Sequence, residues 1–336
     1  MPVQRIADVA RHAGVSTSTV SYVLSGNRPI SAETRRRVEA SIDALGFIPH
    51  AGARSIRRRR TNVVALALPL RPESQVRVQM EFVLSILSAA RQEGKHVLLL
   101  STEDGVQAIR EVTAGSLVDG VILMEVETED ARVALLEQLG FPTVVLGTPG
   151  PPVTLPSIDF DFAAAGALEA TNLMDQGHRH IGYVGHAVET FDRGLGFAVT
   201  ARDAMLRTVR DAGGTATWVS TGGSRADVAE SLERLFALDP DITGLVVHNE
   251  TALPTVLDRL RELGRHVPRD VSVTALAPDA DAEHCVPPVS NVDLPSGEMA
   301  RTSFAMLLEI LDGGTPEASR IPPTLQHRGS VTTPRR

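Results

Sequence analysis

The sequence predicts an α/β protein in which a small helical domain precedes a larger, two-lobed body built on parallel sheets. Apolar segments of about four to six residues alternate with helical segments from residue 61 onward, a pattern typical of parallel strands joined by crossover helices. Ahead of them, apolar residues recur at helical spacing. A length of 336 residues is enough for two or three domains of this kind.

Positive charge is concentrated at the beginning of the chain. The net charge is −8, yet residues 1–60 contain eleven arginines against four acidic residues, which leaves −15 for the remaining 276 residues. A basic segment attached to an acidic body indicates a polyanionic partner bound at one end. An arginine face that contacts only water is the alternative interpretation.

Three helices are predicted within this basic segment. The first carries apolar residues at positions i, i+3, i+4 and i+7, namely Ile6, Val9, Ala10 and Ala13. Gly14 is suited to end it, since glycine readily adopts the left-handed conformation that follows a helix. Ser16 is placed to cap a second helix. Val15, just before this cap, and Val20, within the helix, are spaced to pack together as a hydrophobic staple. Ser31 is placed to cap a third helix, whose buried stripe comprises Val38, Ile42 and Leu45.

The second helix has an apolar face and a hydroxyl-rich face. Its inward side chains are Val20, Val23 and Leu24. Its outward side chains are Thr17, Ser18, Ser21 and Tyr22. Short hydroxyl side chains let a helix approach base edges in the major groove, and Ser16 and Ser21 suit phosphates. Two helices joined by a short glycine turn indicate a helix-turn-helix domain, with a helix hairpin inside a larger fold as the alternative.

The segments IADVARHAGVSTSTVSYVLSG and ISAETRRRVEASIDALGFIPHAGARSI resemble, residue by residue, the DNA-binding head of the lac repressor (LacI/GalR) family of bacterial transcription regulators. The resemblance implies that Thr17, Ser18 and Tyr22 lie where the family reads bases. Arginine is common at position 22 and binds guanine through two hydrogen bonds, so Tyr22 implies an apolar contact to a thymine methyl or a single hydrogen bond. The residues predicted to contact DNA are Ser16, Thr17, Ser18, Ser21, Tyr22, Ser31, Thr34, Arg54 and Ile56.

Residues 49–60 are predicted to form a hinge segment. Its polar side chains and Gly52 disfavour a stable helix. In the family that it resembles, this segment folds into a hinge helix only on operator DNA, in a dimer, and a leucine wedges into the minor groove. Ile56 occupies that place here, and Arg54 with the run Arg57–Arg60 would contact phosphates. A plain interdomain linker is the alternative.

The body is predicted to contain about ten strands, separated by helices such as one over residues 75–93. Apolar segments cover residues 62–70, 96–100, 120–124, 143–147, 180–185, 217–219, 244–248 and 271–275. So many parallel strands predict two similar lobes, with a ligand at the carboxyl ends of strands between them. The stretches DGVIL, HNETALPTVLDRLRELGRHVPRDVSV and PPVSNVDLP resemble the family's effector domain, which is itself similar to periplasmic sugar-binding proteins.

The resemblance implies four effector-binding residues: Arg193, Trp218, Asn249 and Asp161. The Arg193 guanidinium can clamp adjacent hydroxyls or a carboxylate. The Trp218 ring can stack on a sugar, although core packing is an equal alternative. The family commonly carries acidic residues where this sequence has Ala277 and Pro278. Some sugar-responsive members also carry aspartate where this sequence has Gly147. The effector is thus predicted to be a sugar or another metabolite, with a less hydroxylated ligand, an anionic ligand and no ligand left open.

Other classes of function find no support in the sequence. His178 and His180 could share a face of a strand, but no third metal ligand is placed nearby, so no metal is predicted. No GxSxG, phosphate-binding or dinucleotide-binding motif is recognised, so neither an enzyme nor a cofactor is predicted. The single cysteine, Cys285, fits a reducing compartment. Without a membrane-length apolar run or an export signal, the protein is expected in the cytoplasm, away from the membrane.

These observations predict a helix-turn-helix domain over residues 1–48, a hinge over 49–60 and a two-lobed effector-binding and dimerisation domain over 61–336. The predicted function is a repressor that binds near-palindromic, double-stranded operator DNA as a homodimer and responds to a small-molecule effector between the lobes. A solute-binding protein without transcriptional output is the alternative, and the helix-turn-helix segment speaks against it.

Overall fold

The computed structural model describes residues 6–25, 28–45, 60–71, 74–102, 104–150 and 154–335. The chain divides into two compact units: residues 1–63 with residues 116–119, and residues 64–115 with residues 120–336. Most of the predicted hinge, residues 49–59, lies outside the described residues. No helix within the described part of the chain is long and apolar enough to cross a membrane.

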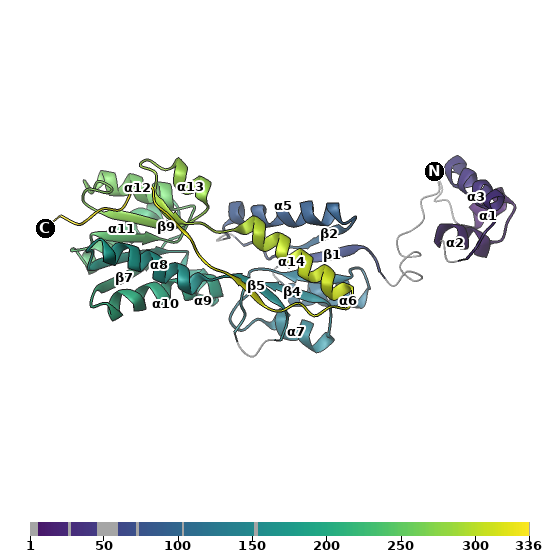
Figure 1. The fold of residues 1–336 in the computed structure, drawn as a ribbon, viewed down its shortest axis with the longest axis horizontal. Coiled ribbons are helices and arrows are strands. Elements are labelled where there is room, and N and C mark those ends of the chain that lie inside the picture. Colours follow the sequence, from purple (N-terminus) through teal and green to yellow (C-terminus); the bar gives the residue numbers. More distant parts are fainter. Residues whose placement is uncertain are drawn as a thin grey trace. The chain divides into compact units, whose positions relative to one another are not determined.

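The first unit carries three short helices, α1 (Ile6–Ala13), α2 (Thr17–Ser25) and α3 (Ala32–Leu45), which we call the head (Figure 1). Each helix has an apolar stripe, and the stripes meet at Val9, Val20 and Val38, which are completely buried. Gly14 has a φ of +65°, as its predicted place after α1 requires. The three predicted helices are confirmed, while the side chain of Leu24 lies outside what the structure describes.

Two serines cap helices of the head, as predicted. The Ser16 hydroxyl accepts a hydrogen bond from the Thr19 N–H at 3.1 Å, and the Ser31 hydroxyl accepts one from the Thr34 N–H at 3.2 Å. The first N–H groups of a helix have no partner inside the helix, so each serine satisfies a donor that would otherwise need water.

The second unit contains two lobes, each with a six-stranded sheet (Figure 1). The first lobe has the strand order β11-β5-β4-β3-β1-β2, and the pairings from β11 to β1 are parallel. Helix α5 packs on α14, and α6 packs on α7. The bounds are β1 (Val63–Ala67), α5 (Val76–Gln92), β2 (His96–Leu100), α6 (Gly105–Ala114), β3 (Gly120–Leu123), α7 (Ala131–Leu139), β4 (Thr143–Leu146), β5 (Ser157–Phe160), α14 (Ser296–Leu311) and β11 (Ser319–Ile321).

The second lobe has the strand order β12-β10-β9-β8-β6-β7, in which β12 is antiparallel to β10 and the remaining pairings are parallel. Helix α8 packs on α10, and α11 packs on α12. The bounds are α8 (Phe162–Asp175), β6 (His180–Gly185), α9 (Val188–Asp192), α10 (Gly196–Asp211), β7 (Thr215–Ser220), α11 (Arg225–Leu238), β8 (Gly244–Val247), α12 (Leu253–Glu262), β9 (Ser272–Leu276), α13 (Asp279–His284), β10 (Ser290–Val292) and β12 (Leu325–Gln326).

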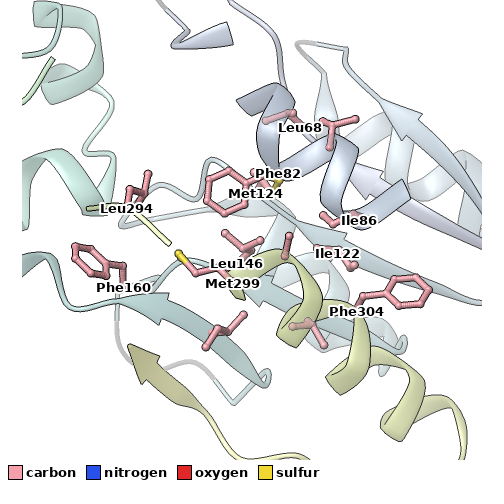
Figure 2. Packing of buried hydrophobic residues seen from close by; sticks show 14 of the residues in the cluster. Leu68, Phe82, Ile86, Ile122, Met124, Leu146, Phe160, Leu294, Met299 and Phe304 are labelled. Carbon is pink, nitrogen blue, oxygen red and sulfur yellow. The ribbon is translucent and has the colours of Figure 1, made fainter. Parts of the chain in front are cut away.

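Three connections join the lobes, from β5 to α8, from β10 to α14 and from β11 to β12. The core of the first lobe is shown in Figure 2, where Ile86, Ile122 and Phe304 pack in one cluster of buried side chains. The same cluster includes Phe82 and Met299, which also line the cleft described below. The wall of the cleft is therefore continuous with a rigid core.

Four strands were not predicted from the sequence: β5, β10, β11 and β12. Strands β10 and β11 have three residues each and β12 has two, too few for a recognisable pattern. Strand β5 alternates half-buried and buried residues in the segment SIDF, unlike the continuous apolar runs around it. The structure thus has twelve strands among the described residues where about ten were expected.

Candidate functional site

The outward face of α2 is the candidate DNA-reading surface. Thr17 and Ser18 are exposed, and Ser21 and Tyr22 are half-buried. The guanidinium of Arg28 lies over the Tyr22 ring, 5.6 Å from its centre, where an aromatic face attracts a cation. This face combines small hydroxyl groups with a cation, which is the chemistry needed for contact with bases and phosphates.

The other predicted DNA contacts in the head lie where helices begin. Ser16 Oγ is 2.9 Å from Thr19 Oγ1, and the Ser31 hydroxyl donates to Thr34 Oγ1 at 2.9 Å. Helix N-termini carry partial positive charge, which favours a phosphate beside them. Arg54 and Ile56 lie outside the described residues. The nine DNA contacts therefore stay predictions.

A cleft between the two lobes of the body holds about 900 Å³ of space, part of it open to solvent. Side chains that directly follow strands line it: Met124 after β3, His186 after β6 and His248 after β8. Thr148, two residues beyond β4, lines it as well. The cleft therefore lies at the carboxyl ends of parallel strands, where the sequence places a ligand.

Much of the cleft wall is apolar. The first lobe contributes Val78, Phe82, Met124, Val126, Leu146 and Met299. The second lobe contributes Phe162, Leu195 and Phe197. A ligand in this cleft would lose water from its carbon atoms, which favours binding.

Arg193 also lines the cleft. It follows α9, and the next residue contacts the other lobe, because the backbone N–H and the hydroxyl of Thr128 donate to the Gly194 carbonyl at 3.0 and 2.9 Å. Glu127 pairs with Leu195 through an isolated β-bridge. These contacts fix the backbone beside Arg193 where the lobes meet.

Asn249 does not line the cleft but is hydrogen-bonded to Gln75, which does. Its side-chain N–H donates to the Thr221 carbonyl at 2.9 Å, and its side-chain oxygen accepts from the side-chain amide of Gln75 at 3.2 Å. The Gln75 oxygen in turn accepts from the Thr251 hydroxyl. Gln75 belongs to the first lobe, so Asn249 is in a position to hold the lobes together.

Asp161 and Trp218 lie outside the lining of this cleft. The Asp161 carboxylate caps α8 by accepting from the Ala164 N–H at 2.9 Å. The Trp218 ring packs 5.1 Å from the Phe191 ring, with the Arg202 guanidinium 4.5 Å from the Trp218 ring centre. The structure thus brings Arg193 alone of the four predicted effector residues into the cleft, and their effector roles stay predictions.

Two buried histidines form part of the cleft. The rings of His186 and His248 lie 4.5 Å apart at 75°, and a ring nitrogen of His248 is 2.8 Å from the Tyr183 hydroxyl. Burial lowers the pKa of His186 to about 3 and holds the pKa of His248 well below its usual value. Both rings are therefore neutral at neutral pH.

Two carboxyl groups of the cleft have the opposite shift. Burial, with a smaller contribution from the negative charges of Asp281, Glu125 and Glu81, raises the pKa of Glu250 to about 7. Burial raises the pKa of Asp159 to about 6, although a hydrogen bond from Thr148 lowers it. Both groups titrate closer to neutral pH than ordinary carboxyl groups do.

The histidines of GHRHIG have separate environments. The buried His178 ring is 2.9 Å from both the Thr243 hydroxyl and the Thr332 carbonyl. His180 is 2.9 Å from the Asp239 carboxylate, and Asp241 lies close enough to complete a group with metal-ligand spacing. No third ligand lies near these histidines in the sequence, so the proximity of Asp239 and Asp241 to His180 is apparent only in the fold.

Polar and charged residues of the cleft that were not predicted from the sequence include Gln79, Glu125, Asp159, His186, His248 and Glu250. Gln79 is 2% exposed among the apolar residues of α5, and a glutamine in a buried stripe was its only signal. His186 and His248 directly follow apolar strands, the position at which this architecture presents ligand-binding side chains.

Comparison with known proteins finds the same two parts. Residues 5–50 match the family model described as bacterial regulatory proteins, lacI family, and residues 170–331 match a periplasmic binding protein-like domain. The transcriptional regulator CelR of Thermobifida fusca is 29% identical over 93% of each chain. The transcriptional repressor PurR of Vibrio cholerae is 28% identical over 90% of each chain.

Solved structures extend the likeness to the fold. A complex of the regulator CelR with cellobiose is 25% identical with a TM-score of 0.70, covering 97% of this chain and 99% of that chain. A lac repressor dimer bound to operator and an anti-inducer is 22% identical with a TM-score of 0.81, covering 98% and 99%. These relatives are regulators and not enzymes.

Proposed function

The chain belongs to the LacI family of DNA-binding transcription regulators, and from this premise we propose that it is a repressor whose operator binding is controlled by a small molecule in the cleft. One observation carries the proposal: the same chain has an exposed, serine-capped α2 and a cleft with buried polar side chains. We keep the division into residues 1–48, 49–60 and 61–336 as part of the proposal. Because the partner is DNA, we place the protein in the cytoplasm.

A homodimer is part of the proposal because the first lobe has an exposed apolar surface. Leu84 and Leu87 of α5 are 65% and 42% exposed, and Leu98 and Leu99 of β2 are 36% and 39% exposed. Strand β2 is also the edge of its sheet, so its neighbouring surface is open to another chain. A two-fold dimer would present two copies of α2 to a near-palindromic operator.

The effector is proposed to have the size of a mono- or disaccharide. The relative CelR was solved with cellobiose, and residues of both lobes line the cleft, so a ligand of that class would contact both lobes. Two hydrogen bonds join the lobes, one between Thr128 and Gly194 and one between Gln75 and Asn249. Both would change if a ligand altered the angle between the lobes. Such a change typically couples two sites by about 1–3 kcal/mol.

Selection of bound DNA from a random pool, with and without a metabolite mixture, tests the proposal. We expect an imperfect inverted repeat, and release or tightening of DNA when the effector is present. Binding of metabolites without preference for any duplex would favour the solute-binding alternative and contradict the repressor.

The Arg193→Ala variant tests the place of the effector. We expect this variant to bind the selected operator normally and to lose the effector response, because it lacks the guanidinium in the cleft. Arg210→Ala, at an exposed arginine of the same lobe outside the cleft, is the matched control and should respond normally. A full response of Arg193→Ala would contradict the assignment of the cleft.

A further inference from the structure

We propose that the effector carries a positively charged amino group, so that an amino sugar, and not a neutral or anionic sugar, is the ligand class of the cleft. The inference that the ligand is of sugar size rests on the proposed function. The charge rests on the residues that line the cleft in this chain.

The cleft has an excess of acidic groups. Among the described residues that line it, the carboxyl groups are Glu125, Asp159 and Glu250, and the guanidinium is Arg193. Its two histidines are neutral because burial holds their pKa values low. Opposite charges attract more strongly in a partly dehydrated cleft than in water, so a cationic ligand is favoured and a phosphorylated or carboxylated one is repelled.

Charges behind the lining add to this excess around Glu250. Its neighbours Asp281 and Glu81 are acidic. Arg77, which approaches from the first lobe, is paired with Asp281. Ser296 donates to the Glu81 carboxylate at 3.0 Å. Arg77 is therefore already engaged by Asp281, and a ligand ammonium would add positive charge beside Glu250.

Three side chains of the lining have buried polar atoms without a hydrogen-bond partner among the described residues. They are Oε2 of Glu250, Nε2 of His186, and both polar atoms of the Gln79 side chain. Gln79 and His186 are each 2% exposed, so bulk water does not reach them freely. Glu250 Oε2, His186 Nε2 and the Gln79 side-chain oxygen can each accept a hydrogen bond, and an ammonium group offers three N–H donors.

Aromatic rings close the same cleft. The Phe197 ring lies 5.2 Å from the His186 ring and 6.0 Å from the His248 ring, and Phe162 stacks at 6.1 Å on His248. Aromatic faces attract cations, most strongly when water is excluded, and they also accept the apolar face of a sugar ring. The aromatic rings and carboxyl groups of the cleft together therefore favour a ligand that has apolar faces and a positively charged amino group.

The departures at Ala277 and Pro278 agree with a ligand unlike the common sugars of the family. Ala277 is completely buried, Pro278 begins α13, and neither lines the cleft. The acidic groups that line this cleft are Glu125 after β3, Asp159 within β5 and Glu250 after β8. Three acidic side chains thus line the cleft together with one arginine, Arg193.

Calorimetry on the full-length protein at low salt tests the inference with compounds of one skeleton. The probes are the β-1,4-linked glucosamine disaccharide, cellobiose, which has hydroxyls in place of the amines, and the N,N′-diacetylated disaccharide, whose amines are uncharged. We expect the diamine to bind at least tenfold more tightly than either, and this preference to shrink as salt is added.

Two variants localise the effect. Glu250→Gln should reduce the preference for the diamine to about threefold or less, whereas Glu317→Gln, the same change at an exposed glutamate, should leave it intact. A proton readout separates charge recognition from a structural role: near pH 6.5, diamine binding should release protons from Glu250, so the heat depends on the buffer. That dependence should be absent in Glu250→Gln, and thermal unfolding without ligand shows whether this variant is folded.

Each outcome decides the inference. Tighter binding of the diamine, lost in Glu250→Gln, supports it. Equal or tighter binding of cellobiose or the diacetylated compound overturns it and leaves the proposed function standing. If none of the three binds, the inference and the sugar-sized effector both fail, while operator selection still tests the DNA-binding part of the proposed function separately.

Discussion

The head and the cleft place polar side chains in opposite situations. In the head, Ser16 and Ser31 are exposed and satisfied by their own helices. In the cleft, Gln79 and His186 are buried and have side-chain atoms with no partner among the described residues. The exposed polar groups of the head can be hydrated until DNA binds, whereas buried polar atoms of the cleft lack a partner that a ligand could supply. The difference teaches where each ligand's specificity originates: in surface complementarity for DNA, and in buried acceptors for the effector.

The two regions also differ in what holds them together. The hydrophobic core of the head consists of a few small side chains around Val9, Val20 and Val38. The core of the first lobe is larger and includes Phe82 and Phe304. Small cores leave small margins of stability. We therefore expect mutations to affect the two regions independently, with larger free-energy losses in the body.

The largest expected effect is that of Phe304→Ala in the body. This ring is 2% exposed in α14, so its removal should cost about 3–5 kcal/mol of the free energy of unfolding of the body. Urea denaturation followed by circular dichroism measures it, with Phe304→Leu as the milder control. Val38→Ala should cost about 2 kcal/mol in the head and leave the unfolding of the body unchanged. A single transition shifted equally by both variants would contradict the separation.

The sequence predicted the parts of the fold that have strong local patterns. Strands β2 and β6 were predicted at their observed bounds, because continuous apolar runs are recognisable without tertiary context. The short strands β10 and β12 were missed, because their place is set by the neighbouring strand and not by their own residues. Local pattern therefore predicts the longer apolar strands better than strands of two or three residues, and β2 was predicted although it is an edge strand.

The cleft was predicted in location but not in composition. Its place follows from the parallel sheets, and Arg193 came from a resemblance to a family. Gln79 and Glu250 are 171 positions apart in sequence, and only the pairing of the lobes brings both into one lining. No periodicity within either segment carries that information. Trp218 is the opposite case, since it was predicted to contact the effector. Its ring packs against Phe191 and Arg202 and does not line the cleft.

A middle-sized effect is expected from Glu250→Gln, and it depends on pH. The pKa of Glu250 rises from 4.5 to about 7 on folding, so the folded protein binds more protons than the unfolded chain between these values. The free energy of unfolding therefore falls as pH rises through this window. At about pH 8 the variant should be more stable than the original protein by about 1–2 kcal/mol, a value reduced because Glu250 is only partly buried, and near pH 4 the gain should vanish.

Asp159 contributes to the same pH window and must be separated from Glu250. Its pKa is raised to about 6, so Asp159→Asn should also flatten the decline, but at lower pH. Urea denaturation at several pH values measures both variants and their combination. An unchanged slope in Glu250→Gln would show that this carboxyl group is ionised and hydrated in the folded protein, which would weaken the contrast between cleft and head.

The smallest expected effect, and the sharpest for the head, is at Ser16. Ser16→Ala removes the acceptor for the Thr19 N–H and should cost about 1 kcal/mol of the head's free energy of unfolding, whereas Ser18→Ala, at an exposed position inside α2, should cost less.

Ser16→Asp separates stability from DNA binding, because aspartate caps a helix as well as serine but brings negative charge toward a phosphate. We expect this variant to unfold like the original protein and to bind operator at least tenfold more weakly. If operator affinity instead followed head stability through all three variants, Ser16 would act only as a cap, and its predicted phosphate contact would be wrong.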